Sequence, residues 1–477
     1  MMICQLAFGL SFYGVMAILT RFFLDDLNYN EADTMMIVGA FSSIGPLFAI
    51  AAGFIADKFL GAYRSLSFAF LIFSLGYALL AVGASIINIP VTLVGIALAS
   101  YARGLLSPSY PSLFKRTFAN NEEFENAYPV NYSVNNVGAL LGQYFFPLLV
   151  IAIGFNGGFM LACAIASVGL AILFFLRRHF LTVGADIDRR AVGTKNWIAF
   201  GVISVAMIAL VFIMFSHMDL GKNIVYALGA GAIIYFVGLM FKASKSEALR
   251  MGTILLMFLL TTAFFVYYGQ MMTSMTIVTI NTMRGDLFGL IPIAPEAAMS
   301  MNPLWCMVAG PIIAWFFPAL EKRKINLTTA SKVALAFVFT TIAFAILTFA
   351  AKNIGADVII RPEIFLVIHF FQAFAEVIVG SMVVAFILSV TPKRIENFSV
   401  SLVSVAIALS GIVGAVLSTS ISLEKGEQIT QEIVKKVYGD YFGYLTFWAV
   451  VMVGLALLVS FIIRKMLIKA NFESAGH

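Results

Sequence analysis

The feature that most constrains this chain is a series of long apolar segments that recurs along the whole sequence. A bilayer's hydrocarbon core is about 30 Å thick, so a helix needs roughly 20 apolar residues to cross it. Only 11% of the residues are charged, against about 25% in soluble domains. The sequence therefore predicts an all-α integral membrane protein with fourteen spans, at 3–24, 34–56, 63–84, 88–110, 129–153, 157–176, 197–216, 223–242, 251–282, 303–319, 330–351, 362–391, 397–423 and 440–463.

Basic residues are distributed unevenly among the connections between these spans. If both termini are cytoplasmic, most of the 30 Lys and Arg fall in cytoplasmic connections, as the positive-inside rule requires. The topology therefore explains the net charge of +6. We expect contact with lipid head groups, no nucleic-acid partner and cytoplasmic termini.

Two polar linkers divide the spans into groups. Between them, the spans 197–216 and 223–242 carry almost no polar residues, so we expect them at the periphery. Twelve core helices remain as six plus six, which is the arrangement of secondary transporters whose halves rock about a midplane site. We predict an N-terminal six-helix half at 1–178, a linker with two extra transmembrane helices at 179–250, and a C-terminal six-helix half at 251–477.

The segment GFIADKFLGAYR connects the second and third spans. It fits the pattern G-x-x-A-D-[KR]-x-x-G-x-x-R, which is typical of the major facilitator superfamily. We expect its glycines to permit close helix approach and its aspartate to pair with its last arginine at a cytoplasmic gate. The alternative is an ordinary charged turn. The predicted gating residues are Gly53, Asp57, Lys58, Gly61 and Arg64.

Three further segments resemble the proton-coupled oligopeptide transporters, a family within that superfamily. FENAYPVNYSVNNVGALLGQYFFPLL resembles the family's fifth-helix signature, FGLIPIAPEAAMSMNPLWCMVAGPIIAWFF is similar to its eighth-helix segment, and IHFFQAFAEVIVGS is similar to its tenth helix. The resemblance covers nearly the whole chain. It implies uptake of di- and tripeptides, driven by protons, across a bacterial inner membrane.

The match is partial at the positions that carry charge in the family. Five of these positions are neutral here, at Gln5, Phe8, Gly9, Ser107 and Gly269. Positions that the resemblance assigns to substrate binding are retained at Tyr13, Tyr132, Asn136, Gln270, Asn302 and Glu376. In the family, the positions of Asn302 and Glu376 hold the amino terminus of the peptide. The alternatives are local packing for the tyrosines and bonds between helices for the asparagines.

One arginine lies inside an apolar span, in the stretch ARGLLSPS. Arg103 precedes Ser107 by one helical turn, so it is a candidate to replace the family's lysine there as a substrate-binding cation. Intramembrane charges usually face the bundle interior with a partner, and Glu376 is the candidate anion. His369 lies two turns before Glu376 on the same face, so both are candidates for proton coupling. The alternatives are snorkelling for Arg103, a structural hydrogen bond for Glu376 and an interfacial place for His369.

The sequence offers no enzyme signature, cofactor motif or metal site. We therefore predict a secondary active transporter, monomeric, that moves small polar solutes by alternating access, most simply short peptides with protons. The main alternative is a facilitator or exporter of a non-peptide metabolite whose proton coupling is lost or altered. A sensor without transport activity is a third reading, and the loops lack a docking domain to support it.

Overall fold

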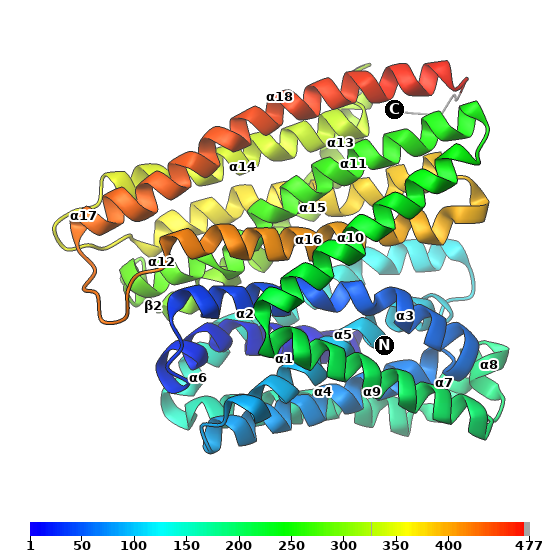
Figure 1. The fold of residues 1–477 in the computed structure, drawn as a ribbon, viewed down its shortest axis with the longest axis horizontal. Helices are drawn as coiled ribbons and strands as arrows, with labels where there is room; N and C mark the ends of the chain where they lie inside the picture. The colour runs from blue at the N-terminus through cyan, green and yellow to red at the C-terminus, as the bar shows by residue number, and fades with distance from the viewer. Residues whose placement is uncertain (326, 472–477) are drawn as a thin grey trace. The chain divides into compact units, whose positions relative to one another are not determined.

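The computed structural model describes residues 1–325 and 327–471, and these residues are mostly helical (Figure 1). One short antiparallel hairpin pairs β1 (Asp286–Leu287) with β2 (Ile291–Pro292). The helices are α1 (Met2–Arg21), α2 (Glu31–Ile44), α3 (Ala49–Ile55), α4 (Ala62–Ser85), α5 (Ile89–Lys115), α6 (Asn121–Phe175), α7 (Arg177–Val183), α8 (Asp186–Arg189), α9 (Thr194–Ser216), α10 (Met218–Phe241), α11 (Lys245–Gly269), α12 (Ser274–Thr282), α13 (Met301–Lys322), α14 (Thr329–Lys352), α15 (Pro362–Val390), α16 (Glu396–Ser418), α17 (Gln431–Ile433) and α18 (Gly439–Lys469).

Polar residues set where many of these helices begin. A side-chain oxygen accepts a hydrogen bond from a first-turn backbone N–H and so satisfies a donor that the helix itself leaves open. Before α11 the Ser244 hydroxyl accepts from Glu247 N, and the Glu247 carboxylate accepts in return from Ser244 N. The same type of cap begins α2, α5, α6 and α14, at Asn30, Asn88, Asn120 and Thr328.

Thirteen helical segments in the described part of the chain are long and apolar enough to cross a membrane. One of them covers 54 residues, Glu122–Phe175. At 1.5 Å per residue it would measure about 80 Å, far more than one crossing requires. It bends at Gly154, whose φ of 69° and ψ of 170° are not helical. Gly154 thus divides α6 into two spans, which confirms the fourteen predicted.

The first of two compact units is Met1–Ile224. Within it α1 packs along α6, and α4 contacts both α5 and α6. The α1–α6 contact brings backbones close together: a Cβ atom added at Gly9 would lie 2.7 Å from the Asn135 carbonyl oxygen, and one added at Gly142 would lie 2.4 Å from that of Leu10. Only glycine permits this approach.

The second unit is Val225–His477. Here α14 packs against α15 and α18, α11 packs against α16, and α13 packs against α15 (Figure 1). Aromatic contacts such as Phe344 with Phe442, at 6.1 Å between ring centres, join α14 to α18. The site helices α11, α13 and α15 are thereby held together in this unit.

The two extra helices are mostly exposed within their own units. α9 packs on α5, where the Tyr101 and Ser204 hydroxyls lie 2.7 Å apart. The division between the units falls inside α10, between Ile224 and Val225. Beyond that point α10 contacts α16, with the Tyr235 and Phe398 ring centres 5.1 Å apart. One extra helix therefore packs mainly with each unit.

Candidate functional site

In the second unit, Glu376 lies at the centre of a small polar cluster. α15 carries the half-buried carboxylate, and α13 supplies the Cys306 thiol, whose sulfur lies 3.4 Å from Glu376 Oε2. The same sulfur lies 3.6 Å from Asn302 Oδ1. The Tyr268 hydroxyl of α11 also interacts with the Glu376 carboxylate. The structure thus brings together Asn302 and Glu376, the two positions that the resemblance assigns to the peptide amino terminus.

Two of these neighbours were not singled out from the sequence. Cys306 follows Asn302 by one helical turn, within the segment that is similar to the family's eighth helix, so that segment contained the signal for its position. Tyr268 comes from a different helix, and no sequence spacing relates it to Glu376. A carboxylate with thiol, amide and phenol neighbours has hydrogen-bond donors but no fixed cation among them, so it can take up a proton or an ammonium group.

Gln270 is also buried in the second unit, at the break between α11 and α12. Its Nε2 donates to the backbone oxygens of Val266 and Gly414, at 3.1 and 3.2 Å. Its Oε1 accepts hydrogen bonds at 2.6 to 2.9 Å from the hydroxyls of Ser274, Ser418 and Tyr441. The amide is fully engaged by α12, α16 and α18. This geometry gives Gln270 a bracing role, and the substrate contact of its side chain stays a prediction.

In the first unit, Arg103 faces neighbouring helices. Its Nη1 donates to the Ser42 carbonyl oxygen of α2 at 2.5 Å, and its guanidinium carbon lies 4.6 Å from the centre of the Phe12 ring of α1. Its methylenes pack on Gly45, where an added Cβ would lie 2.8 Å from Arg103 Cδ. The side chain is partly buried among α1, α2 and α5, so snorkelling does not describe it.

The neutral positions on α1 pack either on α6 or on neighbouring aromatic rings. Gly9 lies directly against the α6 backbone, which leaves no room for a side chain. Phe8 stacks on Phe12 at 5.4 Å between ring centres. The Gln5 amide donates to Asn135 Oδ1 at 2.9 Å, a pairing that the sequence analysis missed. A neutral helix interface therefore stands where the family carries charges.

The other substrate-binding candidates of this unit have different surroundings. Tyr132 is exposed, whereas Asn136 is buried and donates from Nδ2 to the Tyr132 carbonyl oxygen at 3.0 Å. Tyr13 is partly buried, and its ring meets that of Phe12 edge-on at 5.3 Å. One N–H of the Asn136 amide is thus used by its own helix. A ligand would have to bind the other N–H or the amide oxygen.

The predicted gating loop is organised by a residue from outside the motif. Asp188 of α8 is fully buried, and its Oδ1 accepts from Tyr63 N at 2.9 Å, at the start of α4. Its Oδ2 lies 3.2 Å from Arg116 Nη1. Gly61 has a φ of +84°, and a Cβ atom there would lie 2.1 Å from Asp188 Oδ1. The glycine is therefore required both by its conformation and by this carboxylate.

The rest of the motif departs from the expected pairing. Arg64 donates to the backbone oxygens of Ile187 and Arg190 at 3.0 and 2.7 Å, so it binds the α8 segment and not Asp57. Asp57 and Lys58 are exposed, and neither forms an ion pair within the described residues. A Cβ at Gly53 would meet only Pro108, at an ordinary 3.9 Å. The close approach expected at Gly53 is not found.

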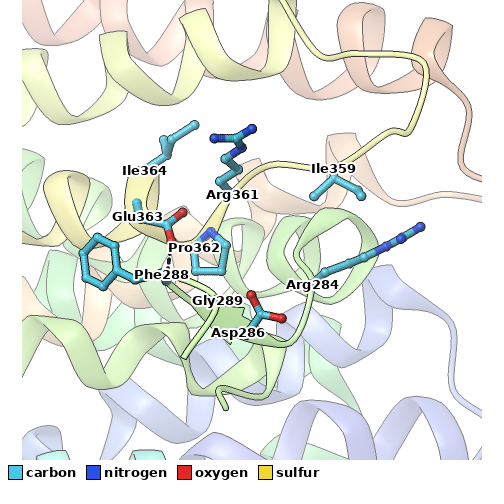
Figure 2. A pocket seen from close by; sticks show the side chains of 9 residues that line it. All are labelled: Arg284, Asp286, Phe288, Gly289, Ile359, Arg361, Pro362, Glu363 and Ile364. Atoms are coloured by element: carbon cyan, nitrogen blue, oxygen red, sulfur yellow. Dashed lines mark hydrogen bonds between the residues drawn. The ribbon is translucent and has the colours of Figure 1, made fainter. Parts of the chain in front are cut away.

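A pocket of about 560 Å³ lies beside the β1–β2 hairpin, at the start of α15 (Figure 2). Figure 2 shows the hydrogen bond that closes one side of it, from Phe288 N to Glu363 Oε1 at 2.5 Å. None of the predicted substrate-binding residues contributes to it. Its lining residues are Arg284, Asp286, Phe288, Gly289, Ile359, Arg361, Pro362, Glu363 and Ile364.

Metal ligands do not cluster in the described ranges: no three His, Cys, Asp or Glu residues lie together there in a way that would hold an ion.

Comparison with known proteins places this geometry in a family. A model of the POT family matches residues 64–433. The dipeptide and tripeptide permease B of Aeromonas hydrophila is 23% identical over 462 residues, covering 95% of this chain and 91% of the relative. The dipeptide and tripeptide permease A of Chromobacterium violaceum is 26% identical over 388 residues, covering 81% of this chain and 77% of the relative.

Solved structures show the same fold. A bacterial homologue of the human drug peptide transporters PepT1 and PepT2 superposes with a TM-score of 0.84 at 22% identity, over 98% of both chains. Tetrameric PepTSo2 superposes with a TM-score of 0.85 at 22% identity, again over 98% of both chains. Because the family model covers well over half of the sequence, the chain belongs to the POT family and has the fold of the major facilitator superfamily.

Proposed function

We propose that this protein moves di- and tripeptides together with protons across the membrane by alternating access. The halves at 1–178 and 251–477 would rock about a central cavity to which Glu376 and Arg103 contribute charges. The observation that carries the proposal is the Asn302–Cys306–Glu376 cluster at the family's substrate position. Within the described residues its acid forms no ion pair. The names of the permease relatives agree with peptide transport.

The chemistry of Glu376 links the two cargoes. A carboxylate in a half-buried site binds either a proton or the ammonium group of a peptide, because both neutralise the same charge. The peptide carboxylate requires a cation, and Arg103 is the candidate in the first unit. Each ligand then changes the affinity for the other, which is the coupling that proton-driven transport requires.

Uptake of a labelled dipeptide into proteoliposomes tests this function. With an acidic exterior, the wild type should accumulate label above empty vesicles, and Glu376→Gln should lose that accumulation. Glu424→Gln, which changes an exposed loop residue, is the matched control and should behave like the wild type. Absence of accumulation by correctly folded wild-type protein would contradict the proposal.

A second function is favoured by one observation. At Gly9 the α6 backbone excludes any side chain, so the missing charges of α1 cannot be restored without repacking. An α1 without these charges is compatible with a facilitator or exporter of a non-peptide metabolite whose proton coupling is altered. A thermal-shift screen separates the two functions: stabilisation by carboxylates or polyols, and not by dipeptides, would favour this alternative.

We further propose a bacterial inner-membrane protein with cytoplasmic termini that works as a monomer and carries out no enzymatic reaction. Charge distribution and the bacterial relatives support the location. PepTSo2, which has the same fold, is tetrameric, so the oligomeric state of this protein has to be measured.

A further inference from the structure

Three polar atoms near Glu376 have no partner with hydrogen-bond geometry among the described residues, although they are deeply buried. Two of them lie on α15: His369 Nδ1, in a side chain 2% exposed, and Gln372 Oε1, in a side chain 7% exposed. Residues 369, 372 and 376 follow one another at helical spacing, so they share one face of α15. The Gln372 side chain approaches the His369 ring without reaching hydrogen-bond geometry. Gln372 Nε2 lies 3.2 Å from the Met275 sulfur, which is only a weak acceptor.

The third atom comes from the helix opposite. Asn302 Nδ2 of α13 has no partner, in a side chain 4% exposed. The Asn302 amide approaches the Glu376 carboxylate without reaching hydrogen-bond geometry. The three atoms therefore lie where α13 contacts α15, and Asn302 connects them to the Glu376 carboxylate.

Direct contacts of other residues hold α13 against α15. Trp305 Nε1 donates to the Leu366 carbonyl oxygen at 2.9 Å, and the Trp305 and Phe370 rings meet edge-on at 5.0 Å between centres. Loose packing of α13 on α15 does not account for three unpaired atoms. Buried polar atoms in proteins almost always have partners, and ordered internal water commonly supplies them.

We propose that ordered water between α13 and α15 connects His369 to Glu376 and forms a proton path within the second unit. The inference deepens the proposed function and rests on it. One imidazole nitrogen of His369 takes up a proton and the other releases one to the adjacent water. Transfer along the water then protonates the Glu376 carboxylate, and His369 returns to its neutral form. Gln372 and Asn302 act as positioning residues that hold the water and carry no proton themselves.

Few other groups compete for the proton. Tyr268 of α11 and Cys306 of α13 are the titratable groups that approach Glu376. Glu296 belongs to the turn Pro295–Ser300, which packs on α15, and Asp286 lies in β1, which contacts the same helix. The charged residues of α13, α14 and α16 all lie in their terminal turns, and those of α11 lie in its first two turns.

Two transport assays separate this path from a structural role. His369→Gln and Gln372→Leu should lower proton-driven dipeptide uptake by roughly tenfold or more, because proton delivery becomes limiting. Counterflow exchange of dipeptide requires no net proton movement and should stay near the wild-type rate. His217→Gln, at the end of α9, is the matched control and should change neither assay.

Other results of these two assays would contradict either the proton path or the proposed function. Unchanged proton-driven uptake in both variants, or an equal loss in both assays, would overturn the proton path. A wild type that shows neither uptake nor counterflow would instead contradict the proposed function itself.

A measurement on the wild type alone covers the case in which the variants fail to fold. Radiolytic hydroxyl labelling oxidises side chains next to ordered water. Met275 beside Gln372 should react several-fold faster than Met257 of α11, since both are buried to a similar degree. Equally slow oxidation of the two methionines would overturn the hydrated path.

Discussion

At the scale of single residues, the partners of a polar side chain decide what it can do. Gln270 has five hydrogen-bonding neighbours, all supplied by the protein. Glu376 meets a thiol, an amide and a phenol, and it remains able to exchange one ligand for another. Both are polar residues inside a membrane bundle, yet the first is held by five bonds within the protein, and the second is the residue we propose to bind cargo.

Replacing Gln270 by Leu should therefore destabilise the protein without removing any charge. The hydroxyls of Ser274, Ser418 and Tyr441 lose an acceptor they share, and leaving buried hydroxyls short of a partner costs about 3 kcal/mol in total. Thermal unfolding in detergent measures the effect. Gln428→Leu, in an exposed loop, should leave the midpoint unchanged. An equal midpoint for both variants would show that the Gln270 bonds contribute little.

Two glycines at positions charged in the family should respond oppositely to glutamate. Gly269 has no atom within 4 Å of an added Cβ, so Gly269→Glu should fold. Gly9→Glu should not, because its Cβ would lie 2.7 Å from the Asn135 carbonyl oxygen. Yield of monodisperse protein and melting temperature compare the two variants. Equal tolerance would contradict the packing described for α1 and α6.

At the scale of elements, the α7–α8 segment is attached to the start of α4 by several bonds at once. The Asp188 carboxylate accepts from the α4 backbone and pairs with Arg116. The Arg64 side chain binds two backbone oxygens of the segment. Phe180 is buried with its ring 6.2 Å from that of Tyr63. The linker after the sixth span is therefore an integral part of the first unit.

Asp188→Ala should lower the free energy of unfolding by about 2–3 kcal/mol, because charge-assisted hydrogen bonds are lost and the Tyr63 N–H is left without its acceptor. Hydrogen exchange at the Tyr63 amide should accelerate in this variant. Asp186→Ala changes the exposed aspartate of the same short helix and should leave both measurements near wild type. Unaltered exchange at Tyr63 in Asp188→Ala would disprove the attachment.

At the scale of the whole molecule, the number and approximate positions of the spans follow from the sequence. Hydropathy detects which segments lie in lipid, and that property is local. It also predicted two spans within α6, which are joined in one helical run and divided at Gly154. The β1–β2 hairpin was missed because two-residue strands carry no periodic signal.

The candidate site was only partly predictable, for a physical reason. Motif spacing placed Asn302 and Glu376 correctly on α13 and α15, whose contact brings them together. The engagement of Gln270 by Ser418 and Tyr441, and the burial of Asp188 against Gly61, join residues more than a hundred positions apart. Such pairings depend on how helices pack, which single-sequence patterns do not specify.

The monomeric state is a prediction at this scale as well. Light scattering coupled to size-exclusion chromatography should give a protein mass near 52 kDa after subtraction of detergent, from the 51.9 kDa chain. A mass about four times larger would indicate the tetrameric assembly seen in PepTSo2.

In the proposed mechanism, one protein couples peptide movement to proton movement through Glu376. A pH-sensitive dye enclosed in proteoliposomes, under an inside-negative potential, reports both events when a labelled dipeptide is added outside. We expect acidification of the interior together with entry of label, and the loss of both in Glu376→Gln. Entry of label without acidification, or unchanged acidification in Glu376→Gln, would contradict it.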